Sequence, residues 1–209
     1  MATYTLRPNA DWDYASSFTA TGGAGSVYGS LSDSSDTTYI KRTSTTVPAS
    51  YYMEMETTTL ASTERITSVN LRARLSIGTT GYVQFSLGVI TDRNGHTVSY
   101  SVPVSKQNTL ALTTVDLALN LPSAPNGAEW SQTYLDNLVV KFTDGATTSA
   151  DRAQLYEIYV DVVTTTKPTV TVDTPTGTVS DTSFPSITWT YADADGDAQT
   201  AYEIGRAHV

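Results

Sequence analysis

Regular alternation of apolar and polar residues over long segments is the feature that most constrains the fold of this chain. In residues 69–77, Val, Leu, Ala, Leu and Ile occupy every second position, with Asn, Arg and Ser between them. Residues 83–89 repeat the pattern with Val, Phe, Leu and Val. Because successive side chains of a β-strand point to opposite sides, each segment predicts a strand with one face in a core and the other toward solvent.

The same alternation predicts further strands, and turn residues such as Asn94-Gly95 separate them. These strands are expected at residues 4–6, 39–41, 51–56, 98–104, 115–119, 138–142 and 156–162. Residues 127–138 differ, because their apolar residues have helical spacing and predict a short helix or 3₁₀ turn that tucks Trp130 under the sandwich. Residues 16–36 are rich in Gly, Ser and Ala and predict a long irregular loop around a short strand at Val27-Tyr28.

Eight to ten strands with a single helical turn predict an all-β fold, a jelly-roll β-sandwich over residues 1–163. A linker is expected at 164–168, because a Pro-flanked extended segment follows. Residues 169–209 open a second β module, with an inward Trp189, of the immunoglobulin-like or fibronectin type III kind. Such a module needs about seven strands and about 100 residues. We therefore expect this module to be incomplete and the chain to be a piece of a longer multi-domain protein.

The last seven residues, Glu203 to Val209, read Glu-Ile-Gly-Arg-Ala-His-Val. A widely used sequencing-library adapter encodes Ile-Gly-Arg-Ala-His-Val when it is translated, so we interpret these residues as an adapter-derived artefact. The alternative is a native third strand that begins near Tyr202-Glu203.

Composition excludes several classes of protein. The chain has no cysteine, so disulfide scaffolds and Cys-based metal sites are excluded. Its net charge is −9 without a basic stripe, which argues against a nucleic-acid partner. No segment has the ~20 apolar residues that span a bilayer, and no signal peptide is visible at Met1, so we expect no membrane partner.

Aromatic residues are the candidates for ligand contact, because an aromatic ring can stack on the apolar face of a sugar. Trp12 and Tyr14 lie beside the long loop and are the predicted ligand-binding residues. Trp130 and Trp189 are expected in cores. The remaining tyrosines considered are Tyr28, Tyr51, Tyr52, Tyr100 and Tyr134, and of the adjacent pair 51–52 one must face outward.

Asp193, Asp195 and Asp197 form the metal-like cluster of the sequence, since three carboxylates at alternate positions can supply oxygens to Ca²⁺. The pattern is not an EF-hand, because its sixth position is Ala198 and its twelfth is Ile204. A polar turn between two strands is favoured, and a structural calcium is the alternative. No other cofactor is expected.

Glu54 and Glu56 share one face of a strand and are the nearest approach to the paired carboxylates of a glycoside hydrolase. Two acids on a solvated strand face are common in non-enzymes. His96 stands on a turn and lacks partners for a triad or a zinc site. The sequence therefore predicts that the chain is not an enzyme.

Several segments together resemble the jelly-roll domains of minor tail and other virion proteins of tailed bacteriophages. The resemblance covers about residues 1–165, rests on loose, mostly structural motifs, and extends to related sugar-binding jelly rolls. Its segments are residues 6–12, 36–40, 66–74, 128–140 and 154–162.

The resemblance implies a non-enzymatic structural or binding module of a phage tail or tail tip, located in the virion and assembled in the host cytoplasm. Its expected partners are other virion proteins and a host cell-wall or surface glycan. The alternative is a carbohydrate-binding module of a bacterial surface protein or secreted hydrolase, located outside the cell. No feature of the sequence predicts an oligomeric state.

Overall fold

The computed structural model describes most of residues 1–209, with gaps that leave part of several loops and the last residues undescribed. The undescribed positions are 14, 23–25, 33–36, 46–47, 79–80, 93–96, 102, 108–112, 117–120, 122, 126, 149–151, 175, 177–185, 197 and 200–209. Tyr14, His96, Asp197 and the adapter-like end therefore lie outside the described residues.

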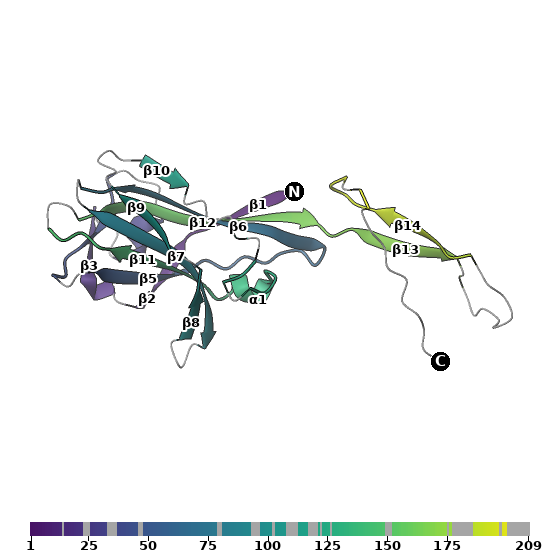
Figure 1. Ribbon diagram of the computed structural model, residues 1–209, viewed down its shortest axis with the longest axis horizontal. Helices are drawn as coiled ribbons and strands as arrows, with labels where there is room; N and C mark the ends of the chain where they lie inside the picture. Colours follow the sequence, from purple (N-terminus) through teal and green to yellow (C-terminus); the bar gives the residue numbers. More distant parts are fainter. Residues whose placement is uncertain are drawn as a thin grey trace.

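Two antiparallel sheets pack face to face and form a β-sandwich (Figure 1). Sheet A has the path β10-β6-β12-β4-β3, with β1 paired to β12. Its strands are β1 (Ala2–Leu6), β3 (Phe18–Thr21), β4 (Tyr39–Arg42), β6 (Glu64–Ser76), β10 (Thr113–Asp116) and β12 (Gln154–Thr166). Sheet B has the path β2-β5-β11-β7-β8, with β9 also paired to β7. Its strands are β2 (Pro8–Asp13), β5 (Ala49–Met55), β7 (Tyr82–Asp92), β8 (Thr97–Tyr100), β9 (Val104–Gln107) and β11 (Leu138–Asp144).

The connectivity is that of a jelly roll. From β4 to β7 the chain alternates between sheets A and B, stays in B for β8 and β9, and then alternates again from β10 to β12. The spatial orders β4-β12-β6-β10 and β5-β11-β7-β8 place each late strand between two early ones. This interleaving is how two Greek keys wrap into a double-sheet jelly roll.

The core lies between the two sheets, and the alternation in the sequence selects which residues enter it. On β6 the residues from Val69 to Leu75 alternate between buried and half-buried. On β7, Val83, Phe85 and Leu87 are fully buried, and Phe85 packs on Phe142 of β11 with ring centroids 5.3 Å apart. The four long predicted strands at 69–77, 83–89, 138–142 and 156–162 are thus confirmed, because burial of one face holds each in register.

The segment between residues 16 and 36 differs from the prediction. Phe18–Thr21 form β3 on β4, and the ring of Phe18 packs against Tyr51 and Phe142. The predicted strand at Val27-Tyr28 is wrong, because the chain makes a 3₁₀ helix there, η2 (Tyr28–Leu31), which buries Leu31. Another 3₁₀ turn, η1 (Ala15–Ser17), precedes β3.

The predicted short helix is confirmed as the single turn α1 (Gln132–Leu135). Trp130 is 7 % exposed just before it, as expected of a core residue. No described helix is long and apolar enough to cross a membrane.

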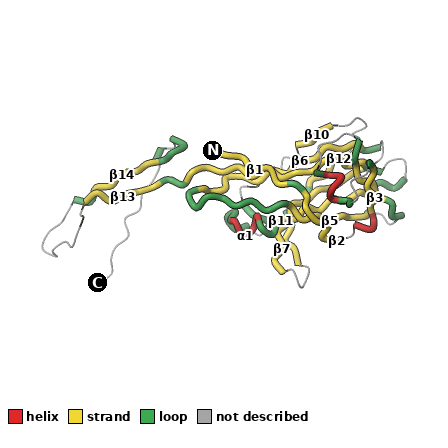
Figure 2. The backbone as a smooth tube through the Cα atoms, turned by 180° about the vertical axis from the view of Figure 1, so that it is seen from behind, coloured by secondary structure: helices red, strands yellow, loops and turns green. Residues whose placement is uncertain are grey.

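A two-stranded hairpin extends beyond one end of the sandwich (Figures 1 and 2). It consists of β13 (Thr169–Thr174) and β14 (Thr188–Ala192), which pair only with each other. β12 continues to Thr166, through most of the residues where the sequence places the linker. Trp189 is half-buried and not in a core, because no described sheet lies opposite the hairpin.

Candidate functional site

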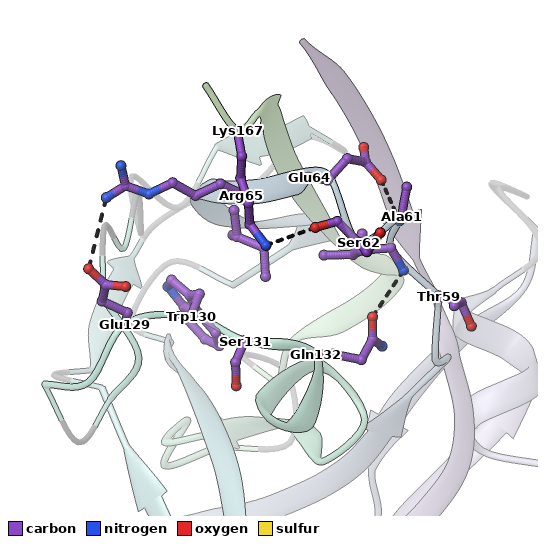
Figure 3. Close-up of a pocket in the computed structure, with 12 residues that line it drawn as sticks. Thr59, Ala61, Ser62, Glu64, Arg65, Glu129, Trp130, Ser131, Gln132 and Lys167 are labelled. Atoms are coloured by element: carbon purple, nitrogen blue, oxygen red, sulfur yellow. Dashed lines mark hydrogen bonds and ion pairs between the residues drawn. The ribbon is translucent and has the colours of Figure 1, made fainter. Parts of the chain in front are cut away.

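A cleft of about 470 Å³ opens at the end of the sandwich from which the hairpin leaves (Figure 3). One wall is the connection from β5 to β6 together with the start of β6, residues 59–66. The opposite wall is residues 129–132, which lead into α1, and Lys167 adds a side chain from the end of β12. The pairing of β6 with β12 brings Lys167 to the start of β6, and hydrogen bonds between Gln132 and residues 58 and 60 hold the third segment beside them.

The floor of the cleft is apolar and held by the core. Trp130 donates its indole N–H to the carbonyl of Leu121 at 2.9 Å and meets the ring of Tyr134 edge-on at 6.5 Å. Ile66 is 8 % exposed and belongs to the core, and Leu60 packs against that core. Because the indole N–H of Trp130 is already bonded to a backbone carbonyl, the part of the ring that lines the cleft is apolar.

Gln132 connects the two walls. Its side-chain amide donates to the carbonyl of Thr58, and its carbonyl oxygen accepts from the backbone N–H of Leu60 at 3.0 Å. The same amide nitrogen also donates to Asp136 at 2.8 Å. These bonds fix the separation of the walls, so that the cleft is preformed.

Charged groups surround the opening. Arg65 and Glu129 face each other at 3.9 Å, with their side chains 64 % and 91 % exposed. An ion pair this exposed and this long is weak, so both groups are available to a ligand. Lys167 donates its ammonium to the carbonyl of Ser62 at 2.9 Å and its backbone N–H to Thr63.

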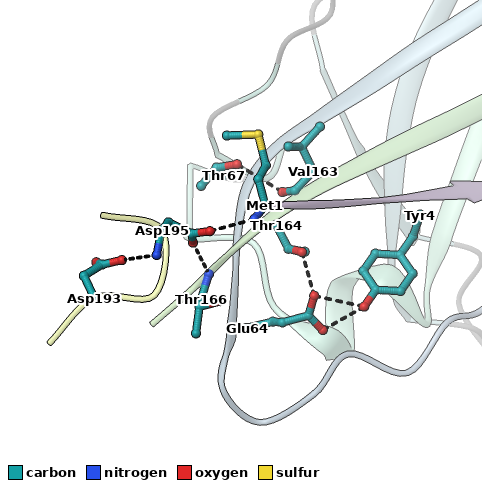
Figure 4. Close-up of polar contacts among 9 residues, drawn as sticks. All are labelled: Met1, Tyr4, Glu64, Thr67, Val163, Thr164, Thr166, Asp193 and Asp195. Atoms are coloured by element: carbon teal, nitrogen blue, oxygen red, sulfur yellow. Dashed lines mark hydrogen bonds and ion pairs between the residues drawn. The ribbon is translucent and has the colours of Figure 1, made fainter. Parts of the chain in front are cut away.

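Glu64 anchors the wall that carries Arg65 (Figure 4). Its carboxylate accepts bonds from the hydroxyls of Thr164 at 2.7 Å and Tyr4 at 2.8 and 2.9 Å, and from the N–H of Ala61 at 2.8 Å. These donors, led by Thr164, lower the pKa of Glu64, and the carboxylate in turn raises the pKa of Tyr4. The β5–β6 connection is thereby tied to β1 and β12.

An apolar floor with a few polar groups at the rim is the usual composition of a site for a small organic ligand. A sugar ring fits this chemistry, because it offers C–H groups to the floor and hydroxyls to Arg65, Glu129 and Lys167. No group of three or more His, Asp or Glu side chains that could hold a metal ion occurs in the described part of the chain.

The predicted ligand-binding pair lies elsewhere. Trp12 is half-buried on β2, at the edge of sheet B, where a register shift between Asp11 and Asp13 leaves it as the extra residue opposite Tyr52. Asp11 beside it accepts a hydrogen bond from the hydroxyl of Tyr51. Trp12 does not line the cleft, and Tyr14 falls outside the described residues, so a ligand role for both stays a prediction.

The acidic cluster forms a turn in its described part. Asp193 accepts from the N–H of Asp195 at 2.8 Å, and Gly196, with φ at 81°, donates its N–H to the carbonyl of Asp193 at 3.2 Å. The Asp195 carboxylate accepts from the amino group of Met1 and from the N–H of Thr166, each at 2.6 Å (Figure 4). These two donors, the amino group first, lower its pKa.

Residues 193–196 thus form the turn of the favoured interpretation. That a strand follows this turn stays a prediction, because residues 200–209 lie outside the described part of the chain. Both oxygens of Asp195 already accept hydrogen bonds, and Asp197 is outside the described residues. A structural calcium at Asp193, Asp195 and Asp197 stays a prediction.

The two glutamates weighed as a catalytic pair have different surroundings. Glu54 is half-buried on the outer face of β5. Glu56 lies beyond the strand, where its carboxylate accepts from the N–H of Arg7 at 3.1 Å and its own N–H donates to the carbonyl of Arg7. Glu56 thus serves to hold the chain between β1 and β2.

The sequence alone did not predict the residues that line the cleft. Arg65 and Glu129 look like ordinary surface charges, and Lys167 was part of the expected linker. The sequence does show the long alternating patterns of β6 and β12. Pairing of these two strands brings residues 64–66 and 164–167 together.

Comparisons with known proteins identify no family for this chain. No family model matches it, and no curated protein does. Four chains of solved structures match. One is described as "Truncated AlyQ with CBM32 and alginate lyase domains", at a TM-score of 0.42 and 11 % identity, covering 77 % of this chain and 33 % of that one. A likeness this distant carries no argument about function.

Proposed function

We propose that the sandwich is a non-enzymatic binding module that holds a saccharide in the cleft at its hairpin end. The observation that carries the proposal is the preformed cleft of about 470 Å³ with an indole in its floor and opposite charges at its rim. Ligand sites of this kind have volumes of about 300–1,000 Å³. The cleft lies near the lower end of this range, which suits one or two sugar rings, such as the end of a glycan.

The bonding of the rim supports binding over catalysis. Glu64 is held by three donors and Glu129 is almost fully exposed, so neither has the apolar surroundings that turn a carboxyl into a general acid. Arg65 and Glu129 instead suit hydroxyl recognition, because a guanidinium only donates hydrogen bonds and a carboxylate only accepts them.

The setting that we propose is a minor tail or tail-tip protein of a phage virion, on the strength of the sequence resemblance. In that setting the module stands among other virion proteins and presents its cleft to a host glycan. The alternative is a sugar-binding module of a bacterial surface protein or secreted hydrolase. Neighbouring genes separate the two: tape-measure and tail genes favour the virion, and a glycosidase domain in the same reading frame would exclude it.

Two rim substitutions test the cleft. Glu129→Gln and Arg65→Gln change exposed side chains and should leave the fold intact. Each should weaken binding on a glycan array by about tenfold, the effect of losing one hydrogen bond to a charged group. Lys41→Gln, a half-buried basic residue of β4 that lies outside the cleft, is the matched control. Array binding that all three variants retain equally would place the glycan elsewhere.

A further inference from the structure

The outer face of sheet B carries a cluster of two tyrosines around a lysine. Lys141 stands on β11, a central strand, opposite Tyr52 of β5 and Ser86 of β7. Its ammonium lies 5.4 Å from the ring centre of Tyr52 and 5.6 Å from that of Tyr100, and the two rings are 6.1 Å apart. We call Tyr52, Tyr100 and Lys141 the tyrosine–lysine face.

A glycine sets the position of Tyr100. Gly88 is the outward-facing residue of β7 directly opposite Tyr100, and a Cβ there would lie 2.6 Å from the Cε1 atom of the ring. The ring therefore occupies the space that any other residue at 88 would fill. Ser101, which follows, donates its N–H to the carbonyl of Leu87 at 2.8 Å and accepts the N–H of Leu87 at 3.1 Å. The backbone beside the ring is thus fixed, and the face is preformed.

Lys141 forms no ion pair with a carboxylate of the described residues. No hydrogen bond or ion pair joins its ammonium to another described residue, although Glu54 lies two residues from Tyr52 on the same face. Several arginines of the chain do meet a carboxylate: these pairs are Arg7–Glu157, Arg42–Asp144 and Arg72–Asp161. In a chain with a net charge of −9, a central lysine whose contacts among the described residues are aromatic rings carries a locally uncompensated positive charge.

We propose that the tyrosine–lysine face binds an anionic polysaccharide chain. A carboxylate or sulfate of the sugar pairs with Lys141, and the sugar rings lie on Tyr52 and Tyr100. The three side chains are half-buried and lie across neighbouring strands of the sheet, so this face suits the middle of a chain, whereas the cleft suits an end. The proposal uses none of the cleft residues and stands independently of the proposed function.

The charge pattern favours a sugar acid over a phosphate chain. Polyphosphates and nucleic acids carry densely spaced charges, and proteins bind them with many cations. Here a single lysine lies between two aromatic rings in an acidic protein, which suits a polymer with sparse anionic groups and apolar ring faces. Because the net charge repels polyanions at long range, the attraction must come from direct contact at this face.

Affinity electrophoresis in gels that contain polygalacturonate tests the proposal, with its methyl ester as the neutral polymer of the same backbone. Lys141→Gln should weaken retardation by polygalacturonate by about tenfold and leave any retardation by the ester unchanged. Lys41→Gln is the matched control on the other sheet and should behave as the parent. Dextran sulfate against dextran repeats the comparison and separates sulfate from carboxylate as the preferred anion.

Gly88→Ala provides a second variant that keeps every binding side chain. Its Cβ displaces the ring of Tyr100, so polygalacturonate binding should fall while circular dichroism confirms the fold. Glu129→Gln should leave this binding unchanged, which separates the outcome from that of the cleft. Equal retardation of the parent and Lys141→Gln by polygalacturonate, or retardation by polyphosphate alone, would overturn the proposal.

Discussion

Replacing Arg42 with methionine should be among the most destabilising single changes in the sandwich. Arg42 of β4 and Asp144 of β11 both point into the space between the sheets, and they are 2 % and 0 % exposed. The guanidinium lies 3.7 Å from the carboxylate and donates to the carbonyls of Asp144 and Ala146. The Asp144 carboxylate also accepts the N–H of Ala146 at 2.8 Å. Arg42→Met keeps most of the volume but leaves a buried carboxylate without its counter-ion.

Breaking one side of a buried ion pair costs about 3–5 kcal/mol, because the remaining charge stays desolvated. In a domain of this size 1 kcal/mol lowers the melting temperature by about 2–4 °C. We therefore expect Arg42→Met to melt about 6–20 °C below the parent. Arg152→Met is the comparison, since Arg152 also donates to two carbonyls, those of Arg42 and Ser44. Its charge acts on Asp144 too, but less than that of Arg42, and no ion pair joins it to a carboxylate among the described residues. Arg152→Met should cost about 1–2 kcal/mol.

The loss in Arg42→Met should depend on pH. Burial raises the pKa of Asp144 above its ordinary value of 3.8, while the N–H of Ala146 and the charge of Arg42 act in the opposite direction. Because the pKa of Asp144 is higher in the folded state, the folded protein is stabilised when this carboxyl is protonated. That stabilisation is complete below pH 3.8 and is lost as the pH rises through the folded-state pKa of Asp144. Without Arg42 that pKa rises further, so the difference between parent and variant should widen from pH 4 toward pH 7.

Urea unfolding followed by tryptophan fluorescence at several pH values measures both effects. The double variant Arg42→Met, Asp144→Leu should regain most of the stability at neutral pH, because neither buried charge of this pair remains. A loss below about 1 kcal/mol for Arg42→Met, or a loss that is the same at pH 4 and pH 7, would refute this account.

Three further expectations concern other parts of the chain. Trp12 lies outside the cleft, so with the glycan in the cleft Trp12→Ala should leave array binding unchanged. A loss of at least about 1 kcal/mol with an intact fold, the scale of a lost aromatic contact, would instead make Trp12 part of a glycan site. Glu64→Gln should speed hydrogen exchange at the Ala61 amide. The fold lowers the pKa of Glu64, so its ionised carboxylate stabilises the parent protein above pH 4.5. This stabilisation is lost as the pH falls through the folded-state pKa, and the variant lacks it throughout. Asp195→Asn removes the charged acceptor of the Thr166 N–H, so thermolysin should cleave before Val170 several-fold faster.

The long strands were predictable from the sequence because each has a buried side. On β6 and β12 a shift of one residue would turn every apolar side chain to solvent, so the alternation specifies both the strand and its register. β3 was missed because only Phe18 anchors it, in a segment otherwise rich in Ser, Gly and Ala. Its place is set by pairing with β4, which is a contact between chain segments and leaves no local pattern.

The buried ion pair could have been predicted from the same alternation. Arg42 follows Ile40 at an inward position of its strand, and Asp144 follows Phe142 at an inward position of another. Two opposite charges at inward positions must meet or remain unpaired in the core, and unpaired burial is too costly. The cleft, in contrast, requires knowing that the ends of β6 and β12 lie together beside the segment before α1.

Trp189 and Tyr52 show that alternation tells which side of a strand a residue faces but not what covers that side. Trp189 pairs with Val172 on a face of the hairpin that no described sheet covers, so the tryptophan is not in a core. Tyr52 differs from Trp189, because its neighbours Tyr51 and Met53 point into the core and Tyr52 therefore lies on the outer face of the sheet. An aromatic residue on a side that the pattern reserves for polar residues gains nothing from the core of its own sheet. Cross-strand contacts are one reason for such a residue, and the rings of Tyr39 and Tyr156 form a pair of this kind. Tyr52 stands beside both a second tyrosine and a lysine, and this combination is what makes it a candidate for ligand contact.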